Sequence, residues 1–432
     1  MGAATGSSLA RGFVGLTFEA SVLGTPALDA STSNLGQFLS ALDQGRKRSR
    51  GILRFGGSDS DDKVVWASDS LRPLPAWASK SIGPSDLRAL ATITGPSGWS
   101  VDLGVNLLHP SVSKAAKEVA SARQILGTQL HEVSIGNEPD LYTLFNGIPV
   151  NFEEYIARVH EYKAAIRALT PSVKFAGPDF YSTSWLDAFA WSSENTPSEL
   201  STFSYHFYPA YDCNRVAISA SALLSEASFT SEKVLIDRAS LAARLGGHTL
   251  ALDEFNSISC GHYSPVEHQF ASALWAVHGL LLAASRGVVS VGVQMTPSNC
   301  NSYTPLCIPD PNKPGEFAPR PIFSAMELVA HLETGVFLGT TSSASLPAGV
   351  NAWALRGADG TVSVVVENTR SKPLSALTLS MPGRTLVSTT ELTAPALDAT
   401  DGVTLITTPS SSSSLTGLHV AAQSVKVFTL GS

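Results

Sequence analysis

Short apolar segments alternate with longer amphipathic segments over residues 12–334 of the chain. The apolar segments are hydrophobic at nearly every position, which is typical of parallel strands that are covered on both faces. The predicted strands are residues 15–18, 51–55, 100–106, 132–135, 174–176, 202–206, 249–253 and 288–294. Helices are predicted between them, and Asn151 before the acidic Glu153 and Glu154 is a typical helix start. Eight successive strand and helix pairs predict an α/β fold, a closed (β/α)8 TIM barrel rather than an open sheet.

The pattern changes after Gly335, where the apolar segments become short, β-branched and separated by Gly, Pro or Ser. Further strands are predicted at residues 350–355, 361–367, 376–379, 384–390, 402–407 and 424–430. Such a series is typical of an all-β sandwich. We therefore expect two domains, a catalytic barrel at 1–334 and a β-sandwich at 335–432. The second domain is expected to brace the barrel, because its sequence suggests no exposed aromatic cluster for binding sugar.

Composition and charge narrow the possible partners. The 432 residues are 44% hydrophobic and 15% charged, which supplies ample apolar material for a large core. The net charge of −7 argues against nucleic acid or a long sulfated glycan, because such polyanions are held by basic surfaces. No apolar run is long enough to span a membrane, so we expect no membrane partner. We expect the protein to act as a monomer.

Four cysteines allow three pairings if all are oxidised. Cys300 and Cys307 bracket a short loop, and Cys213 and Cys260 follow predicted strands that are neighbours in the barrel. Two disulfides in this arrangement would require an oxidising compartment, whereas four unpaired thiols remain the alternative. The residues after Met1 do not resemble a signal peptide. We expect a secreted protein whose signal is absent from this chain, with a cytoplasmic protein as the alternative.

The residues most informative about chemistry are two glutamates at predicted strand ends. Glu138 follows the fourth strand within Gly136-Asn137-Glu138-Pro139, and Glu254 ends the seventh. Catalytic groups of TIM barrels lie where strands end and loops begin, so both are expected on one rim. A retaining glycosidase needs two carboxyl groups about 5–5.5 Å apart. A single glutamate at a strand end would more simply form a salt bridge or a helix cap, but two on these strands favour catalysis.

The two glutamates would have different tasks. Glu138 is predicted to be the acid/base, which protonates the leaving oxygen and later deprotonates water. Glu254 is predicted to be the nucleophile, which attacks the anomeric carbon and forms a glycosyl-enzyme. The first must be protonated while the second is ionised, so their environments must differ. Esterification then removes the charge of Glu254 and allows the pKa of Glu138 to fall.

Several segments together resemble glycoside hydrolase family 79, the family of β-glucuronidases and heparanase. The segment Gly136-Asn137-Glu138-Pro139 is similar to the large clan of retaining glycosidases with (β/α)8 barrels. The similarity extends over most of the chain and is specific in the combination of four segments. These are Leu53-Arg54-Phe55-Gly56-Gly57, Ser134-Ile135-Gly136-Asn137-Glu138-Pro139-Asp140, Tyr205-His206-Phe207-Tyr208 and Glu254-Phe255-Asn256-Ser257-Ile258-Ser259-Cys260-Gly261.

The resemblance implies roles for residues around the two glutamates. Asn137 would hydrogen-bond the 2-hydroxyl of the sugar, although a buried asparagine that fixes the strand end would look the same. Tyr208 would hydrogen-bond the nucleophile and help to keep it ionised, while His206 would orient its neighbours. Glu19 and Ser58 match positions that bind sugar hydroxyls, with a structural cap as the alternative for each.

The resemblance also implies how a glucuronate carboxylate would be recognised. Relatives use backbone N–H groups after the nucleophile and a tyrosine after the eighth strand, which correspond here to Cys260, Gly261 and Tyr303. The chain departs from the family at His262, where relatives often carry a second glycine. His262 would add a donor or narrow the pocket, and an ordinary loop surface at His262 and Tyr263 is equally expected.

The sequence thus predicts a retaining exo-β-glucuronidase that acts on a glucuronic-acid-containing oligosaccharide or glycoside without metal or organic cofactor. Another retaining β-glycosidase of the clan is the alternative, acting on a xyloside, arabinoside or galactoside, or cutting within a chain as heparanase does. An inactive sugar-binding homologue is disfavoured, because such proteins usually lose one of the two carboxylates. Nucleotide-binding and serine-hydrolase motifs are absent from the sequence.

Overall fold

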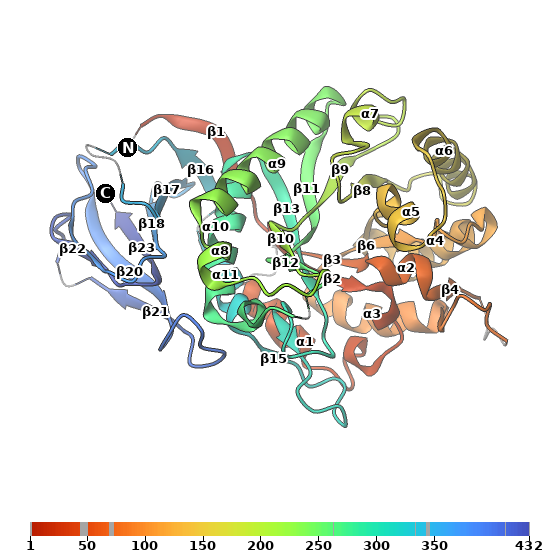
Figure 1. The fold of residues 1–432 in the computed structure, drawn as a ribbon, viewed down its shortest axis with the longest axis horizontal. Coiled ribbons are helices and arrows are strands. Elements are labelled where there is room, and N and C mark those ends of the chain that lie inside the picture. Colours follow the sequence, from red (N-terminus) through yellow and green to blue (C-terminus); the bar gives the residue numbers. More distant parts are fainter. Residues whose placement is uncertain are drawn as a thin grey trace.

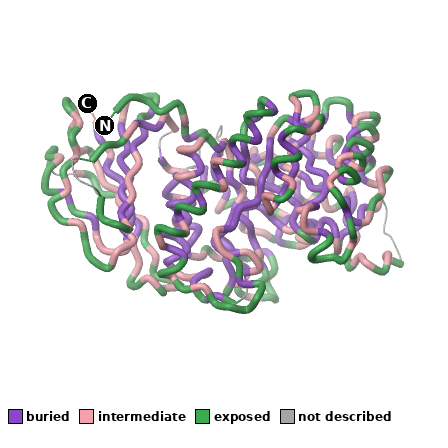
Figure 2. The backbone as a smooth tube through the Cα atoms, turned by 45° about the horizontal axis from the view of Figure 1, so that its top comes forward, coloured by how far each residue is buried: buried purple, intermediate pink, exposed green. Residues whose placement is uncertain are grey.

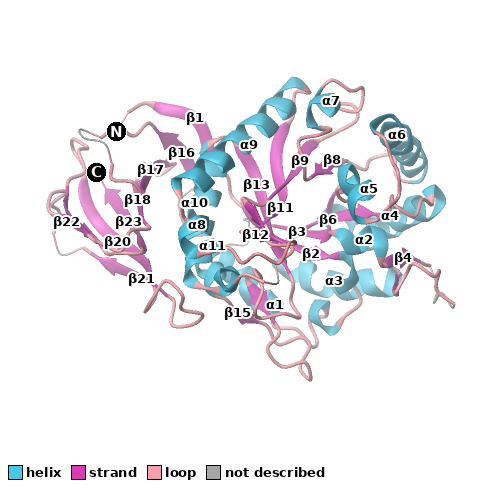
Figure 3. Cartoon of the chain, in the orientation of Figure 1, coloured by secondary structure: helices cyan, strands magenta, loops and turns pink. Residues whose placement is uncertain are grey.

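The computed structural model of the protein describes residues 2–43, 51–68, 73–261, 263–332, 334–342, 346–410 and 412–431. Figure 1 shows two parts: a barrel of strands surrounded by helices, and a set of antiparallel strands at the end where both termini lie. The cartoon coloured by secondary structure shows the same separation, with helices concentrated around the barrel (Figure 3). The predicted fold class, a TIM barrel with a C-terminal β domain, is confirmed. No helix in the described ranges is both long and apolar enough to cross a membrane.

Eight parallel strands form the barrel, in the order in which the sequence predicts them. They are β2 (Val14–Glu19), β3 (Ile52–Gly56), β6 (Ser100–Val105), β7 (Leu130–Ile135), β8 (Ala176–Phe180), β9 (Thr202–Phe207), β11 (Thr249–Phe255) and β13 (Val288–Met295). The sheet runs β7-β6-β3-β2-β13-β11-β9-β8. A parallel bridge from Val133 to Phe175, with a 3.0 Å bond from the Val133 N–H to the Lys174 carbonyl, joins its two ends and closes the barrel.

Helices cover the outside of the barrel because each buries one apolar face against the strands. The longer ones are α1 (Leu35–Leu42), α3 (Pro84–Ser97), α4 (Val112–Leu126), α6 (Phe152–Leu169), α9 (Glu226–Leu245), α10 (Phe270–Ser285) and α11 (Pro321–Ala330). Short elements decorate the loops: α2 (Ser58–Asp62), α5 (Tyr142–Phe145), α7 (Leu186–Ala190), α8 (Ala220–Leu223), and the small strands β4 (Val64–Trp66), β5 (Lys80–Ile82), β10 (Ala210–Tyr211), β12 (Ile258–Ser259), β14 (Leu306–Cys307) and β15 (Ala318–Pro319). Buried residues follow the barrel strands, whereas exposed ones follow the loops (Figure 2).

The amino-terminal half of the barrel interior is a polar cavity of about 340 Å³. Barrels of this kind are usually filled by branched side chains. Here small residues such as Gly15, Ala251 and Gly292 line the interior and leave space. Arg54 and Asp253 also line the cavity, so it ends beneath the rim where the predicted catalytic glutamates lie.

The remaining strands form a seven-stranded antiparallel sheet covered by a two-stranded one. The large sheet contains β1 (Ala4–Leu9), β16 (Gly335–Leu338), β17 (Val350–Gly357), β18 (Val362–Asn368), β20 (Thr385–Thr393), β21 (Thr404–Pro409) and β23 (Ser424–Gly431). β19 (Leu374–Leu377) and β22 (Leu418–Val420) form the small sheet. Because β1 pairs with β16 at the edge, we propose that the β domain predicted at 335–432 also takes in this N-terminal strand.

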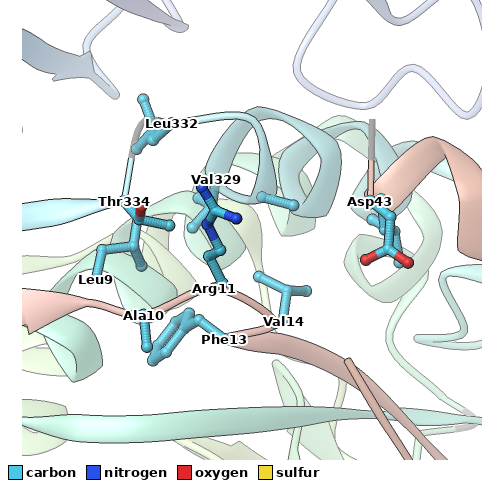
Figure 4. A pocket seen from close by; sticks show the side chains of 12 residues that line it. Leu9, Ala10, Arg11, Phe13, Val14, Asp43, Val329, Leu332 and Thr334 are labelled. Atoms are coloured by element: carbon cyan, nitrogen blue, oxygen red, sulfur yellow. The ribbon is translucent and has the colours of Figure 1, made fainter. Parts of the chain in front are cut away.

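Helix α10 connects the barrel and the β domain. Almost all of its residues are buried, which is expected of a helix that is apolar on every side. Its first N–H groups donate to the Ala399 and Leu397 carbonyls, and His278 Nδ1 lies 3.0 Å from Glu367 Oε2 in β18. On the amino-terminal side of the barrel, Arg11 of the β1–β2 linker lies in a pocket formed with the end of α11 (Figure 4). The two parts therefore pack together over a shared apolar core.

Candidate active site

The two predicted catalytic glutamates meet at the carboxyl end of the barrel. Glu138 follows β7 by three residues in a left-handed conformation (φ 49°), and Glu254 is the penultimate residue of β11. One carboxylate oxygen of each and a ring nitrogen of His206 all lie within 4.8 Å of one another. This spacing suits the roughly 5–5.5 Å that double displacement requires, and it is too short for a water to fit between the carboxylates as inversion requires.

His206, from β9, is the immediate partner of Glu138. Its Nε2 lies 3.2 Å from Arg54 Nη2, and its Nδ1 lies 2.8 Å from Glu138 Oε1. An arginine can only donate, so Nε2 is the acceptor and Nδ1 carries the proton that it donates to Glu138. Burial lowers the pKa of His206, which favours this neutral form. The bond occupies Oε1 of Glu138, so a proton on this carboxyl group would be carried by Oε2.

The environment of Glu138 suits an acid. Burial raises its pKa to about 7, which the charge of Arg54 only partly opposes. A carboxyl group of this kind is protonated near neutral pH, which is the state needed to protonate a leaving group.

Glu254 has two donors, one on each oxygen. The Tyr208 hydroxyl donates to Oε1 at 2.7 Å, and Arg54 Nη1 donates to Oε2 at 3.2 Å. Both contacts fix the orientation of the carboxylate. The structure thus places the Tyr208 hydroxyl on Glu254, as the resemblance implies, and adds Arg54 as a second partner.

Arg54 lies at the centre of a buried network beneath the two glutamates. Its side chain is only 2% exposed, and it makes ion pairs at 2.9 Å with both Asp179 and Asp253 in addition to Glu254. Although burial acts in the opposite direction, the charge of Arg54 lowers the pKa of Asp179. Burial and the neighbouring Asp179 raise the pKa of Asp253 well above its usual range. Arg54 is therefore the shared positive charge of a cluster of buried acidic side chains.

We expect Arg54→Met to lower the free energy of unfolding by roughly 3–5 kcal/mol at pH 7, because it leaves buried carboxylates without their cation. Chemical denaturation measures this. Without the cation, the pKa values of these carboxyl groups in the folded variant are raised. They are therefore protonated at pH 5, where they cost little to bury, and become ionised as the pH rises. The loss of unfolding free energy should thus be smaller at pH 5 than at pH 7. Arg238→Met is the matched control, because Arg238 pairs with Asp187 at the surface. Equal losses in the two variants would contradict a buried network.

Asn137 is held by both its backbone and its side chain. Its N–H donates to Asp61 Oδ2 at 2.7 Å, and Tyr142 donates to the same oxygen at 2.6 Å. The Asn137 Oδ1 accepts from Arg54 Nη2 at 3.0 Å. That bond leaves the amide NH2 group available to a ligand. The position therefore fits both the predicted contact with a sugar hydroxyl and a structural role.

Glu19, at the end of β2, lies on the same rim. Its Oε2 accepts the Asp59 N–H and its Oε1 accepts Gln294 Nε2, both at 2.9 Å. A Cβ atom at Gly57 would lie 2.3 Å from the Glu19 carboxylate, so only glycine allows this close approach. Burial, followed by the charges of Asp59 and Glu254, raises the pKa of Glu19 well above its usual range. Ser58, at the start of α2, is exposed at this rim.

The loop after Glu254 is tied to the loop after β9. A disulfide joins Cys213 to Cys260, and a second joins Cys300 to Cys307, which confirms both predicted pairs. Cys260 and Gly261 are consecutive residues with positive φ values of 70° and 55°. Gly261 lies against the ring of Tyr303, and a Cβ atom there would lie 2.0 Å from a ring carbon. The structure thus brings Cys260, Gly261 and Tyr303 together, while His262 lies outside the described residues.

We expect Gly261→Ala to disturb the glycone site without unfolding the protein. The added methyl group must displace Tyr303, and alanine is strained at a positive φ. We expect KM to rise roughly 10-fold or more, the scale of an Å-level misplacement in a site. Gly360→Ala, at φ 84° with open space around the Cβ position, is the control for backbone strain alone. Unchanged kinetics for Gly261→Ala would remove this loop from the site.

Sequence reasoning missed several residues of this site. Arg54 lies within a segment that resembles the family, but the sequence predicts no role for it, although a charged residue inside an apolar strand is itself a signal of a buried ion pair. Asp179 and Gln294 gave no local signal, because their partners come from other strands. Asp61 is likewise a buried acceptor for the Asn137 segment.

The same groups could also gather around a cation. Glu138, His206 and Glu254 bring three candidate ligand atoms together, as do Asp179, His206 and Asp253. Arg54 already supplies the positive charge at this point, since it contacts members of both groups directly. The donor set is therefore explained by an arginine-centred network.

The comparisons with known proteins show the fold. No protein-family model matches the chain, and no curated protein matches its sequence. A 4-O-α-L-rhamnosyl-β-D-glucuronidase from Fusarium oxysporum superposes with a TM-score of 0.78 at 16% identity, covering 98% of this chain and 97% of that one. An α-L-arabinofuranosidase from Thermotoga maritima gives 0.72 at 16% identity, covering 99% and 98%. A family 51 arabinofuranosidase from Xanthomonas axonopodis pv. citri gives 0.71 at 14% identity, covering 99% and 97%. Over nearly its whole length the chain thus has the two-part fold of these glycoside hydrolases.

Proposed function

We propose that the protein is a retaining exo-β-glucuronidase that belongs to glycoside hydrolase family 79. The observation that carries the proposal is the close pair Glu138 and Glu254, each held by its own hydrogen-bond partner on the same rim of the barrel. The four segments that resemble the family contribute residues to the same end of the barrel, including Arg54, His206 and Cys260. A shared fold with glycosidases that include a glucuronidase supports the same reaction class.

In the first step, Glu138 gives its proton to the glycosidic oxygen while Glu254 attacks the anomeric carbon. Tyr208 and Arg54 hold the nucleophile in place until its charge passes into the ester bond. Glu138 is then a carboxylate, and the Nδ1–H of His206 stabilises it. In the second step, Glu138 takes a proton from water, the water oxygen attacks the anomeric carbon, and Glu254 leaves as a carboxylate.

The choice of a sugar acid rests on the loop after the nucleophile. Cys260 and Gly261 have successive left-handed conformations, and no acceptor among the described residues takes either of their N–H groups. Free consecutive N–H groups form a small anion-binding concavity. Burial raises the pKa of the Glu19 carboxyl group on the same rim, which weakens its repulsion of a sugar carboxylate. The net charge of −7 favours a terminal sugar over a long sulfated chain.

The proposal is tested by rates on aryl glycosides that differ only in the sugar: β-glucuronide, β-glucoside, β-galactoside, β-xyloside and α-L-arabinofuranoside. A preference for the glucuronide is the expected result. A preference for a neutral sugar would keep the two-glutamate mechanism and overturn the role of Cys260 and Gly261. An absence of turnover together with binding of a sugar would favour an inactive sugar-binding protein.

The pH dependence follows from the state of Glu138. Because its pKa is raised to about 7, the acid is present below this pH and is lost as the pH rises through it. We expect kcat/KM for an alkyl glucuronide to fall tenfold per pH unit above about 7. The control is an aryl glucuronide with a very acidic leaving group, which needs little protonation and should show a much weaker alkaline limb. If kcat/KM falls equally above pH 7 for both substrates, the fall must come from the titration of a group other than Glu138.

We also propose that the protein is secreted. Both disulfides would be reduced in an ordinary cytosol, whereas they persist in an oxidising compartment. Thiol labelling of the unfolded protein from its native source should find no free cysteine. Four labelled thiols would favour the cytoplasm instead.

A further inference from the structure

Two tyrosines beside the catalytic mouth have no part in the mechanism above. Tyr181 follows β8, and its ring centroid lies 6.2 Å from that of Tyr208, the partner of the nucleophile. Its hydroxyl lies 3.3 Å from the Ser259 Oγ. In β10, Tyr211 pairs directly with the same Ser259 of β12. Ser259 therefore links Tyr181, whose ring lies near that of Tyr208, to Tyr211 of the neighbouring strand.

Tyr211 is exposed although the loop that carries it is firmly held. Its side chain is 56% exposed and so is accessible to a ligand. The next residue, Asp212, is fully buried and accepts the Tyr263 N–H at 3.1 Å, and Cys213 is joined to Cys260. These contacts fix the backbone that carries Tyr211 before a ligand arrives, which reduces the entropy cost of binding.

The leaving group must lie on the side of these tyrosines. Glu138 protonates the glycosidic oxygen, so the aglycone extends past Glu138. Two residues later, Asp140 accepts the Tyr181 N–H at 3.4 Å and the Ser182 N–H at 2.7 Å, which fixes the Tyr181 loop to the Glu138 segment. Burial raises the pKa of the Tyr181 hydroxyl, and the charges of Glu138 and Tyr211 act in the same direction, in keeping with their proximity.

We propose that Tyr181 and Tyr211 form a leaving-group subsite for an aglycone that has a ring with an apolar face. Such a ring is either aromatic or the apolar face of a pyranose, and both are held by packing against a tyrosine ring. The inference rests on the proposed glycosidase function and specifies which glycosides the protein prefers.

The test uses 2-phenylethyl and hexyl β-glucuronides, whose primary alcohols leave with nearly the same ease but differ in the ring. We expect the wild type to favour the 2-phenylethyl substrate. Tyr211→Ala should lower kcat/KM for it roughly 3- to 10-fold, the scale of one aromatic contact, and should change the hexyl rate less than about twofold. Tyr211→Phe should restore the preference. The control is Trp191→Ala, because Trp191 is also an exposed aromatic but follows α7, away from β10 and β12 (Figure 1).

The outcomes separate the two proposals. Equal losses on both substrates in Tyr211→Ala, or no loss at all, would overturn the subsite and leave the glycosidase function intact. No turnover of any glycoside by the wild type would overturn the function and the subsite together. A glucuronyl disaccharide distinguishes the two kinds of ring. If Tyr211→Ala lowers kcat/KM for the disaccharide as much as for the 2-phenylethyl substrate, the natural aglycone is a pyranose. If it lowers kcat/KM for the 2-phenylethyl substrate alone, the natural aglycone is aromatic.

Discussion

Glu254→Gln should lower kcat/KM by roughly 10⁴- to 10⁶-fold on every glycoside, whatever its leaving group, as removal of a catalytic nucleophile does. The amide keeps the size of the side chain but is far too weak a nucleophile to form the glycosyl-enzyme. Its amide oxygen can still accept from Arg54, and the Tyr208 hydroxyl can rotate to accept from the amide NH2, so the fold should be preserved. Steady-state rates on an aryl glucuronide, beside a thermal unfolding curve, measure both expectations.

A smaller variant identifies the nucleophile by stereochemistry. Glu254→Ala leaves space on the face from which the carboxylate attacked, so added azide can attack there and should give the α-glucuronyl azide. Glu267→Ala is the control, because Glu267 is a buried carboxyl group with a raised pKa in the nearby loop but lies outside the proposed mechanism. Activity in Glu254→Gln within tenfold of the wild type would refute the assignment.

Glu138→Ala should separate substrates by their leaving groups. For an alkyl glucuronide we expect a loss of roughly 10²- to 10⁴-fold in kcat/KM, the usual contribution of general acid catalysis. For an aryl glucuronide with a very acidic leaving group, the first step should be nearly unchanged, because that oxygen leaves without a proton. The second step remains slow without the base, so a burst of aryl alcohol equal to the enzyme concentration should precede slow turnover.

Azide provides the complementary check on Glu138. It needs no base and can attack the glycosyl-enzyme, so it should accelerate turnover and give the β-glucuronyl azide, opposite to the product of Glu254→Ala. His206→Gln is the positioning control, because it removes the ring contact at 2.8 Å and leaves the carboxyl group of Glu138 in place. This variant should shift the pH dependence of kcat/KM, and its rate loss should not depend on the leaving group. A uniform loss on all substrates in Glu138→Ala would contradict its role.

The barrel strands could be predicted because each is an apolar run buried on both faces. The fifth strand shows the limit of this reasoning. It was predicted at 174–176, whereas β8 spans Ala176–Phe180, because Gly177-Pro178-Asp179 resembles a turn by composition. Asp179 is tolerated in the strand only because Arg54, 125 positions away in sequence, supplies its partner. A local pattern contains no information about such a pair.

The residues of the candidate site that follow strand ends could be predicted. Those whose contacts run across the barrel could not. The meeting of Glu138 and Glu254 on one rim could be predicted from their positions at strand ends, since every strand end points to that rim. The contacts of Arg54 with three other strands depend on closure of the sheet, which periodicity does not describe. β1 was missed for a similar reason: its sequence is largely polar, and only pairing with the distant β16 makes it a strand.

That pairing affects how the protein is made. β1 is synthesised before the whole barrel, but β16 begins only at Gly335. At roughly 5–20 residues per second, β1 waits about 20 to 70 seconds for its partner to leave the ribosome. A waiting strand rich in apolar residues would be a template for wrong pairing with other chains. Ala-Thr-Gly-Ser-Ser-Leu offers little for another chain to bind, so the polar sequence that hides β1 from prediction also protects it during synthesis.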